Sequence, residues 1–211
     1  MNKRNYQKEL DALIGRNRLE GKRPRLLLHV CCAVCASYVL EYLHNDFYIT
    51  IAYYNPNITE EREYRYRLSE LERYIREAGL SGIRFAEVDY DPDSFFELTR
   101  GRENDREGGA RCSLCFAQRL GYTARLCKEG DYDYFATTLT ISPLKNAEVI
   151  NAIGEKLAAE YGVNYLCSDF KKKEGYKRSI ELSKQYDLYR QNYCGCVFSE
   201  KEAERRNTVN E

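Results

Sequence analysis

The chain has 211 residues, 43% of them hydrophobic, and its 33 Lys and Arg balance 33 Asp and Glu. This length is typical of one large domain, and the composition excludes a wholly disordered or fibrous protein. Residues 1–25 lack the apolar core of a secretion signal, and the longest apolar stretch, residues 26–40, is interrupted by His29 and too short to cross a bilayer. The sequence therefore predicts a cytoplasmic protein with no membrane partner.

Strands and helices are predicted to alternate along the chain. Residues 26–30 form a continuous apolar run, typical of a strand buried on both faces, and residues 33–43 follow as a helix. Further strands are predicted at residues 48–54, 83–88, 134–139 and 164–167, and further helices at residues 59–78, 92–98, 110–127 and 146–161. This order predicts an α/β protein with three layers and a mainly parallel sheet. Ligands of such sheets collect beyond the carboxyl ends of the strands, where we expect Cys31, Cys32, Asn55, Asp89 and Asp169.

The charges are segregated although the net charge is zero. Residues 1–25 carry eight Lys or Arg against three acids, and residues 171–190 carry seven against three, whereas residues 41–107 carry sixteen acids against nine bases. The two basic segments could form one electropositive face, or they could be solvated helix faces. In residues 64–67, a Tyr-Arg-Tyr-Arg run, a solvated face is favoured for the arginines over base stacking.

The cysteines carry the strongest signal. Seven of the nine fall into three tight groups, which are Cys31-Cys32-x-x-Cys35, Cys112-x-x-Cys115 and Cys194-Gly-Cys196. In a reducing compartment such groups indicate metal ligation or redox catalysis rather than structural disulfides. Thiolates select iron–sulfur clusters, zinc or copper(I), and a C-x-x-C on a helix places both sulfurs on one face. The isolated Cys127 and Cys167 are expected to be small core residues.

Several interpretations of these residues stay open at this point. A structural zinc site is one alternative, although the vicinal Cys31 and Cys32 lie at a strand-to-helix turn rather than in a zinc knuckle. The Cys194-Gly-Cys196 pair could be a redox-active disulfide or could bind a second metal. His29 is either a hydrogen-bonded core histidine or a supporting group and proton donor at the site.

Six stretches together resemble the QueH-type epoxyqueuosine reductases over nearly all of residues 25–199. They are LLLHVCCAVC (26–35), YYNPNI (53–58), GARCSLCFAQRL (109–120), TTLTISPLKNAEVI (137–150), SDFKKKEGYKRS (168–179) and YRQNYCGCVFS (189–199). Val34 stands where such proteins commonly have proline, and some relatives have Asp in place of Cys35. The resemblance divides the chain into a basic N-terminal extension (1–24), a single catalytic domain (25–199) and a charged C-terminal tail (200–211).

The resemblance implies reduction of epoxyqueuosine to queuosine at the wobble position of transfer RNA, a two-electron deoxygenation that releases water. It also implies a Rossmann-like topology of the HUP type. ATP use is disfavoured because His29 to Cys32 replace a phosphate-binding loop rich in glycine. The expected partners are a tRNA that carries epoxyqueuosine and an electron donor that the sequence does not identify.

Site residues follow from this resemblance. We expect a [4Fe–4S] cluster on Cys31, Cys32, Cys112 and Cys115, with room for an additional iron ion. Cys194, Cys196 and Cys35 are then a redox pair or ligands of a second metal. His29 and Asp169 are candidate catalytic or supporting groups. The candidate tRNA-binding residues are Lys171, Lys172, Lys173, Lys177, Arg178 and Arg190. The competing functions are a zinc-stabilised RNA-binding module and a thiol–disulfide oxidoreductase.

Overall fold

The computed structural model describes residues 4–208. Its centre is a parallel sheet of four strands in the order β3-β2-β1-β4, namely β1 (Arg25–His29), β2 (Tyr48–Ala52), β3 (Arg84–Phe85) and β4 (Tyr134–Thr137). This strand order is that of a Rossmann-like sheet. The predicted α/β fold with a parallel sheet is therefore confirmed.

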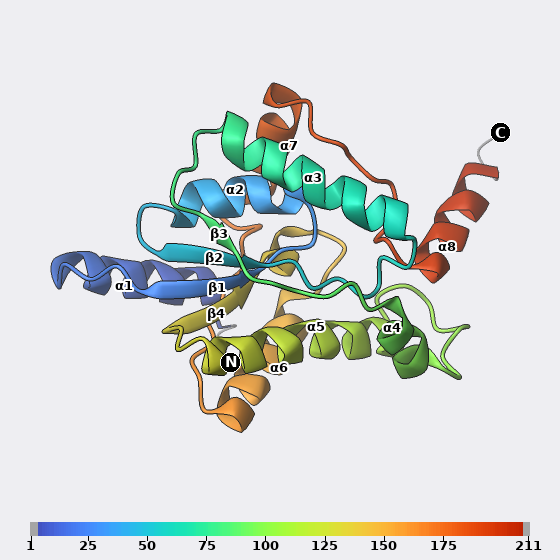
Figure 1. The fold of residues 1–211 in the computed structure, drawn as a ribbon, viewed down its shortest axis with the longest axis horizontal. Helices are drawn as coiled ribbons and strands as arrows, with labels where there is room; N and C mark the ends of the chain where they lie inside the picture. Colours follow the sequence, from blue (N-terminus) through green and yellow to red (C-terminus); the bar gives the residue numbers. More distant parts are fainter. Residues whose placement is uncertain (1–3, 209–211) are drawn as a thin grey trace.

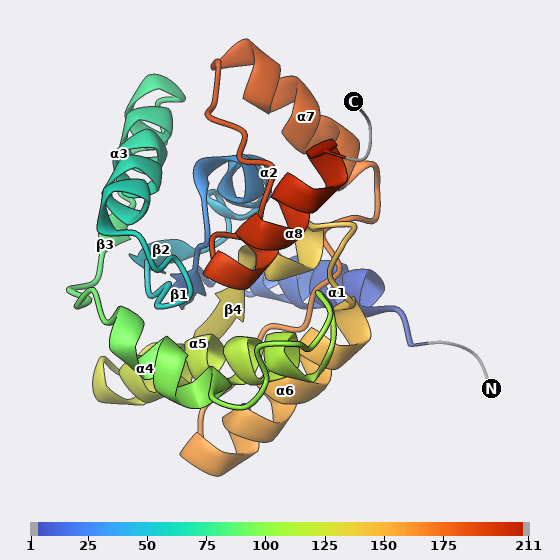
Figure 2. The same cartoon turned by 90° about the vertical axis from the view of Figure 1, so that its right-hand side faces the viewer.

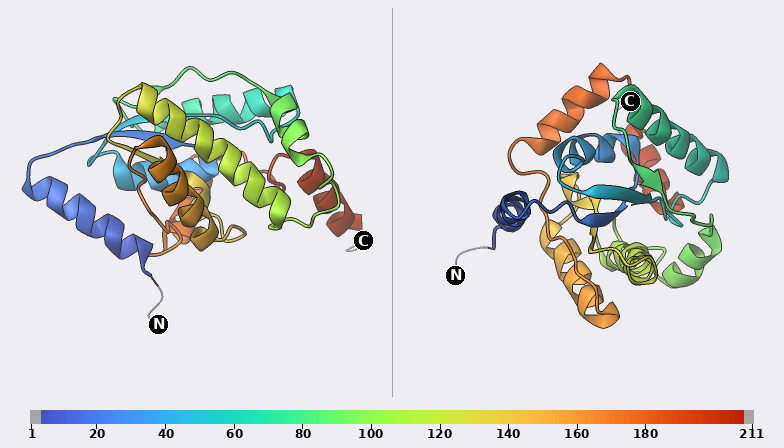
Figure 3. Two further views of the ribbon diagram at one scale, coloured as in Figure 1. Left: turned by 90° about the horizontal axis from the view of Figure 1, so that it is seen from below. Right: turned by 60° about the vertical axis from the view of Figure 1, so that its left-hand side comes forward.

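Helices cover both faces of the sheet, as Figures 1 and 3 show. One layer contains α2 (Ala33–Leu43), α3 (Glu61–Glu77) and α7 (Gly175–Gln185), and the other contains α5 (Ala110–Glu129) and α6 (Ala147–Tyr161). Side chains of β1 alternate between the layers because successive residues of a strand point to opposite faces. Leu26 and Leu28 pack with the core around α2, whereas Leu27 packs with Phe116 and Leu120 of α5. The apolar run that predicted β1 is thus buried on both faces.

Two helices lie in segments outside the central α/β unit. Helix α1 (Tyr6–Leu19) buries Leu10 and Ile14 in the core and contacts α2 through a 3.1 Å bond from Gln7 Nε2 to Tyr42 Oη. Helix α8 (Val197–Thr208) lies in front of the carboxyl ends of the strands in the view of Figure 2. Both segments are therefore ordered parts of the fold, whereas the division at residues 24 and 200 stays a prediction.

Four predicted strands are shorter than expected. Strand β2 ends at Ala52 rather than at residue 54. Strand β4 ends at Thr137, because the Thr137 hydroxyl accepts a 3.1 Å bond from Leu139 N and starts the short 3₁₀ helix η1 (Thr138–Ile141). The strand predicted at residues 83–88 is reduced to β3, and the one at residues 164–167 to a single bridge between Phe135 and Tyr165. The predictions thus gave the position of each of these strands but not its length. Helix α4 (Pro92–Thr99) agrees with the expected span, and in residues 4–208 no helix is long and apolar enough to cross a membrane.

Candidate active site

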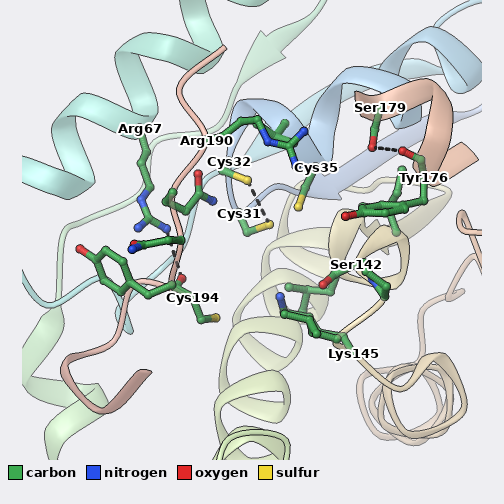
Figure 4. Close-up of a pocket in the computed structure, with 18 of the residues that line it drawn as sticks. Cys31, Cys32, Cys35, Arg67, Ser142, Lys145, Tyr176, Ser179, Arg190 and Cys194 are labelled. Carbon is green, nitrogen blue, oxygen red and sulfur yellow. Dashed lines mark hydrogen bonds between the residues drawn. The ribbon is translucent and has the colours of Figure 1, made fainter. Parts of the chain in front are cut away.

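The first cysteine group lies where β1 gives way to α2. The sulfur atoms of Cys31, Cys32 and Cys35 all lie within 4.8 Å of one another, and those of Cys31 and Cys32 are 3.9 Å apart (Figure 4). Cys32 is the N-cap of α2, so two of the thiols stand at a helix N-terminus, which favours thiolates. Hydrogen bonds from Cys32 and Cys35 lower the pKa of Cys31, and the pKa of Cys32 rises to about 11 because its proton is shared with Cys31. The three sulfurs are close enough to bind one metal ion.

The other two cysteine groups meet on the opposite side of the site. Cys112 and Cys115 lie on the first turns of α5, and Cys115 packs with Cys196 against Phe95. All four cysteines of these groups line a cavity of about 30 Å³, together with Lys145. Burial and the proximity of Cys194 and Cys196 raise the pKa of the Cys115 thiol to about 12. The Cys115 thiol therefore stays protonated until a metal or another cation takes the place of the proton.

A larger cavity of about 310 Å³ joins the cysteine groups. Cys31, Cys32 and Cys35 form one wall, and residues 190–194 form another (Figure 4). Lys145 and Cys194 line this cavity and the smaller one alike. The three groups that are far apart in the sequence are therefore brought to one site, at the carboxyl ends of the strands as expected.

The segment that carries Cys194, here called the C-terminal strap (residues 186–196), is held by side chains of α3. Arg67 Nη1 donates a 3.2 Å hydrogen bond to the Cys194 carbonyl, and Arg73 donates to the carbonyls of Tyr186 and Asp187 at 3.0 and 3.1 Å. The expectation that Arg67 is part of a solvated helix face is wrong. Its side chain is buried because Glu63 pairs with it at 2.7 Å and the strap covers it.

Gly195 is a second fixed point of the strap. Its φ of +115° lies in a region that side chains with a Cβ rarely adopt, and an added Cβ would come within 2.8 Å of Ile58 Cγ1. The glycine between the two cysteines thus allows the strap to lie close to Ile58 and Arg67.

His29 and Arg119 form a buried polar group behind the cavity. Burial and the nearby Arg119 lower the pKa of His29 to about 3, so the imidazole is neutral. Its Nδ1 lies 2.8 Å from the Thr137 hydroxyl, and its Nε2 accepts a 3.2 Å hydrogen bond from Arg119 Nε. Arg119 also donates to Asn55 Oδ1 at 2.7 Å and points Nη1 toward Cys115 Sγ at 4.0 Å. His29 is thus a buried, hydrogen-bonded histidine, and its role as a catalytic or supporting group stays a prediction.

Arg119 was missed by the sequence analysis, as was Lys145. The spacing held a signal for Arg119, because a residue four positions after Cys115 lies over it on a helix. For Lys145 no such local signal exists, since it lies on the loop before α6 and reaches the cysteines only through the fold.

Asp169 lies beside the cysteine site rather than in the lining of either cysteine cavity. It pairs with Lys171 at 3.0 Å and lines a neighbouring surface cavity of about 610 Å³ with Arg4 and Lys172. Leu144 and Lys145 separate this cavity from the site, since both residues line the two cavities. A catalytic role of Asp169 stays a prediction.

The predicted tRNA-binding residues are spread over several surfaces. Lys173 pairs with Asp11, Lys177 with Glu174, and Arg178 with Glu41 and Glu181. Arg190 lines the larger cysteine cavity and Lys172 the neighbouring surface cavity. Their role in tRNA binding stays a prediction, and the positions favour Arg190 and Lys172.

The two isolated cysteines lie away from the site. Cys127 is fully buried in the core between α5 and β4, as predicted. Cys167 is partly buried, 3.8 Å from the Arg4 guanidinium, and burial raises the pKa of its thiol to about 12, with Glu155 adding to the effect. Neither residue lines the cysteine cavities.

Comparisons with known proteins agree with the motifs. The family model described as "Epoxyqueuosine reductase QueH" matches residues 26–202. A protein of that name from Staphylococcus aureus is 43% identical over 92% of this chain and 83% of its own length, and one from Streptococcus pyogenes is 42% identical over 93% and 78%. Among solved structures, the U34-tRNA thiolase NcsA from Methanococcus maripaludis with its [4Fe-4S] cluster covers 97% of this chain and 72% of its own at 14% identity, with a TM-score of 0.48.

Proposed function

The chain belongs to the epoxyqueuosine reductase QueH family, and from this premise we propose that it reduces epoxyqueuosine in transfer RNA to queuosine. The convergence of the three cysteine groups on two cavities that share Cys194 and Lys145 carries the proposal. The reaction takes two electrons and two protons, converts the epoxide on the cyclopentane ring to an alkene and releases the oxygen as water. The reaction takes place in the cytoplasm, with tRNA as substrate and an external reductant as electron donor.

The cofactor of this proposal is a [4Fe–4S] cluster, which supplies electrons one at a time at low potential when bound. The residues present fit such a group, because seven thiols converge and all seven belong to a triplet or a pair at short sequence spacing. The imidazole of His29 does not compete with them, since both of its ring nitrogens are in other contacts. Glu107, a carboxylate that lines both cavities, lies 3.8 Å from Arg206. Thiolate-rich sites of this kind select iron–sulfur clusters or zinc.

The division of the cysteines is proposed in two versions. In the first, Cys31, Cys32, Cys112 and Cys115 hold the cluster and the remaining cysteines form a redox pair or bind a second metal. The cavity that Cys112 and Cys115 share with Cys194 and Cys196 supports a second version. In that version these four hold the cluster, and the compact group at the start of α2 binds the additional iron ion.

The cavity of about 310 Å³ receives the modified base in this proposal. The wobble base lies in a single-stranded anticodon loop, so a protein can splay it out and recognise its edges. Residues 190–194 and Tyr176 face the cysteine wall across this cavity, and Arg190 is placed to contact the tRNA backbone at its rim (Figure 4). Residues 25–199 form the catalytic unit, supported by α1 and α8 from the two flanking segments.

One anaerobic assay tests the proposed function. The purified protein is incubated with tRNA that contains epoxyqueuosine and with a strong one-electron reductant, and the nucleosides are analysed by mass spectrometry. Queuosine formed by a protein that contains iron and acid-labile sulfide is the expected result. A colourless zinc protein without turnover would instead support the RNA-binding module, and turnover that survives removal of metal by a chelator would support the thiol–disulfide oxidoreductase.

A further inference from the structure

Three arginines are fully buried, and one of them differs from the other two in its partners. Arg67 pairs with Glu63 at 2.7 Å, and Arg111 lies 3.7 Å from Glu202. Arg119 has no carboxylate within 4.0 Å among residues 4–208, and its guanidinium contacts only neutral groups and the Cys115 sulfur. A buried charge without a counter-charge is costly, so a buried guanidinium normally lies beside an anion.

Lys145 is a second cation at the same place without a carboxylate partner. It is half-buried, it lines both cysteine cavities, and no ion pair joins it to a carboxylate in the described part of the chain. Figure 4 shows its amine directed at the space between Cys31 and Cys194. Glu107, a carboxylate that lines both cavities, lies 3.8 Å from Arg206.

Both cations lie among cysteines. Arg119 Nη1 lies 4.0 Å from Cys115 Sγ. Lys145 lines both cavities with Cys194, and it lines the larger cavity with Cys31 and Cys35 as well. Both side chains therefore face the sulfur atoms that would hold an iron–sulfur group.

An iron–sulfur group held by several thiolates is an anion, because the thiolate charges exceed the positive charge of its core. We propose that Arg119 and Lys145 are positioning residues that neutralise this anionic group and thereby raise its reduction potential. The inference rests on the proposed function. The physical reason is that a nearby cation stabilises the reduced state, which carries one more negative charge, more than the oxidised state.

The test is a redox titration of the anaerobically reconstituted protein, followed by visible absorption and electron paramagnetic resonance, with iron and sulfide content measured on the same samples. Lys145→Gln removes the charge at a partly exposed position, and Lys145→Arg keeps it. Arg119→Gln and Arg119→Lys make the same comparison at the buried position. Lys156→Gln is the matched control, because Lys156 is an exposed lysine on α6 that lines neither cysteine cavity.

We expect the midpoint potential to shift to more negative values in Lys145→Gln, and to stay near the wild-type value in Lys145→Arg and Lys156→Gln. Arg119→Gln is expected to lower the potential further or to lose iron. If the Arg119→Gln protein does not fold, the comparison of Lys145→Gln with Lys145→Arg still tests the inference. A Lys145→Gln protein with wild-type iron content and an unchanged midpoint would overturn the inference while leaving the proposed function intact. A wild-type protein without an iron–sulfur group would instead overturn the proposed function.

Discussion

The cysteines at the start of α2 and Cys194 on the C-terminal strap line the same cavity, but different forces place them there. Cys31, Cys32 and Cys35 lie within five residues on a strand end and the first turn of a helix, so local backbone geometry brings their sulfurs together. Cys194 lies on a segment without helix or strand, and hydrogen bonds from α3 and the conformation of Gly195 fix its position. Metal binding by the first group should therefore be lost mainly when its own thiols are replaced. The position of the second group should also change when distant residues are replaced.

The largest expected effect tests whether α5 supplies thiolates to the iron–sulfur group. Cys112→Ser or Cys115→Ser removes one thiolate from a helix face that provides two, and we expect loss of the cluster and of turnover. Iron content and queuosine formation are the measurements. Cys127→Ala on the same helix is the control, which should keep its iron at a cost of about 1 kcal/mol in stability. A Cys112→Ser or Cys115→Ser protein with full iron content and turnover would show that this pair is not a ligand pair.

The next largest effect separates the roles of the strap and of the α2 group. In the first division of the cysteines, Cys194→Ser or Cys196→Ser stops turnover but leaves most of the [4Fe–4S] absorption, whereas Cys31→Ser removes it. In the second division the outcomes are exchanged, because Cys194 and Cys196 then bind the cluster. Visible absorption and iron content of the three variants decide between the two, and equal spectra in all three would contradict both divisions.

A smaller effect is expected when the strap is displaced without removing a thiol. Gly195→Ala introduces a Cβ that would meet Ile58 at 2.8 Å, in a backbone region unfavourable for alanine. A displacement of about 1 Å at a reacting centre can reduce the rate about 100-fold, so we expect a loss of turnover of that order. Gly162→Ala is the matched control, since its φ is also positive at +69° but an added Cβ would meet no atom within 4 Å. Equal turnover of the two variants would mean that the strap needs no fixed geometry.

The smallest effect concerns tRNA binding at the rim of the strap. Arg190 lines the cavity, whereas Lys177 pairs with Glu174 on α7, so only Arg190→Ala should lose a phosphate contact. The slope of log K against log salt should become shallower by about one in Arg190→Ala and change little in Lys177→Ala. Binding measured over a range of salt concentrations checks this, with iron content as a control. If neither variant changes the slope, the tRNA contacts lie elsewhere, with Lys172 in the neighbouring cavity as the next candidate.

The sequence by itself determined the α/β order, the grouping of seven cysteines and the family, because apolar periodicity and short spacings are local properties. It also indicated that the ends of the strands would carry the site. Only the tertiary structure decided that Cys194 shares one cavity with Cys115, that Arg67 is buried beneath the strap, and that α1 and α8 pack on the fold. The same holds for Arg119 and Lys145, which have no carboxylate partner within residues 4–208 because of the distant segments that surround them. Such facts depend on long-range packing, which no pattern within a few residues encodes.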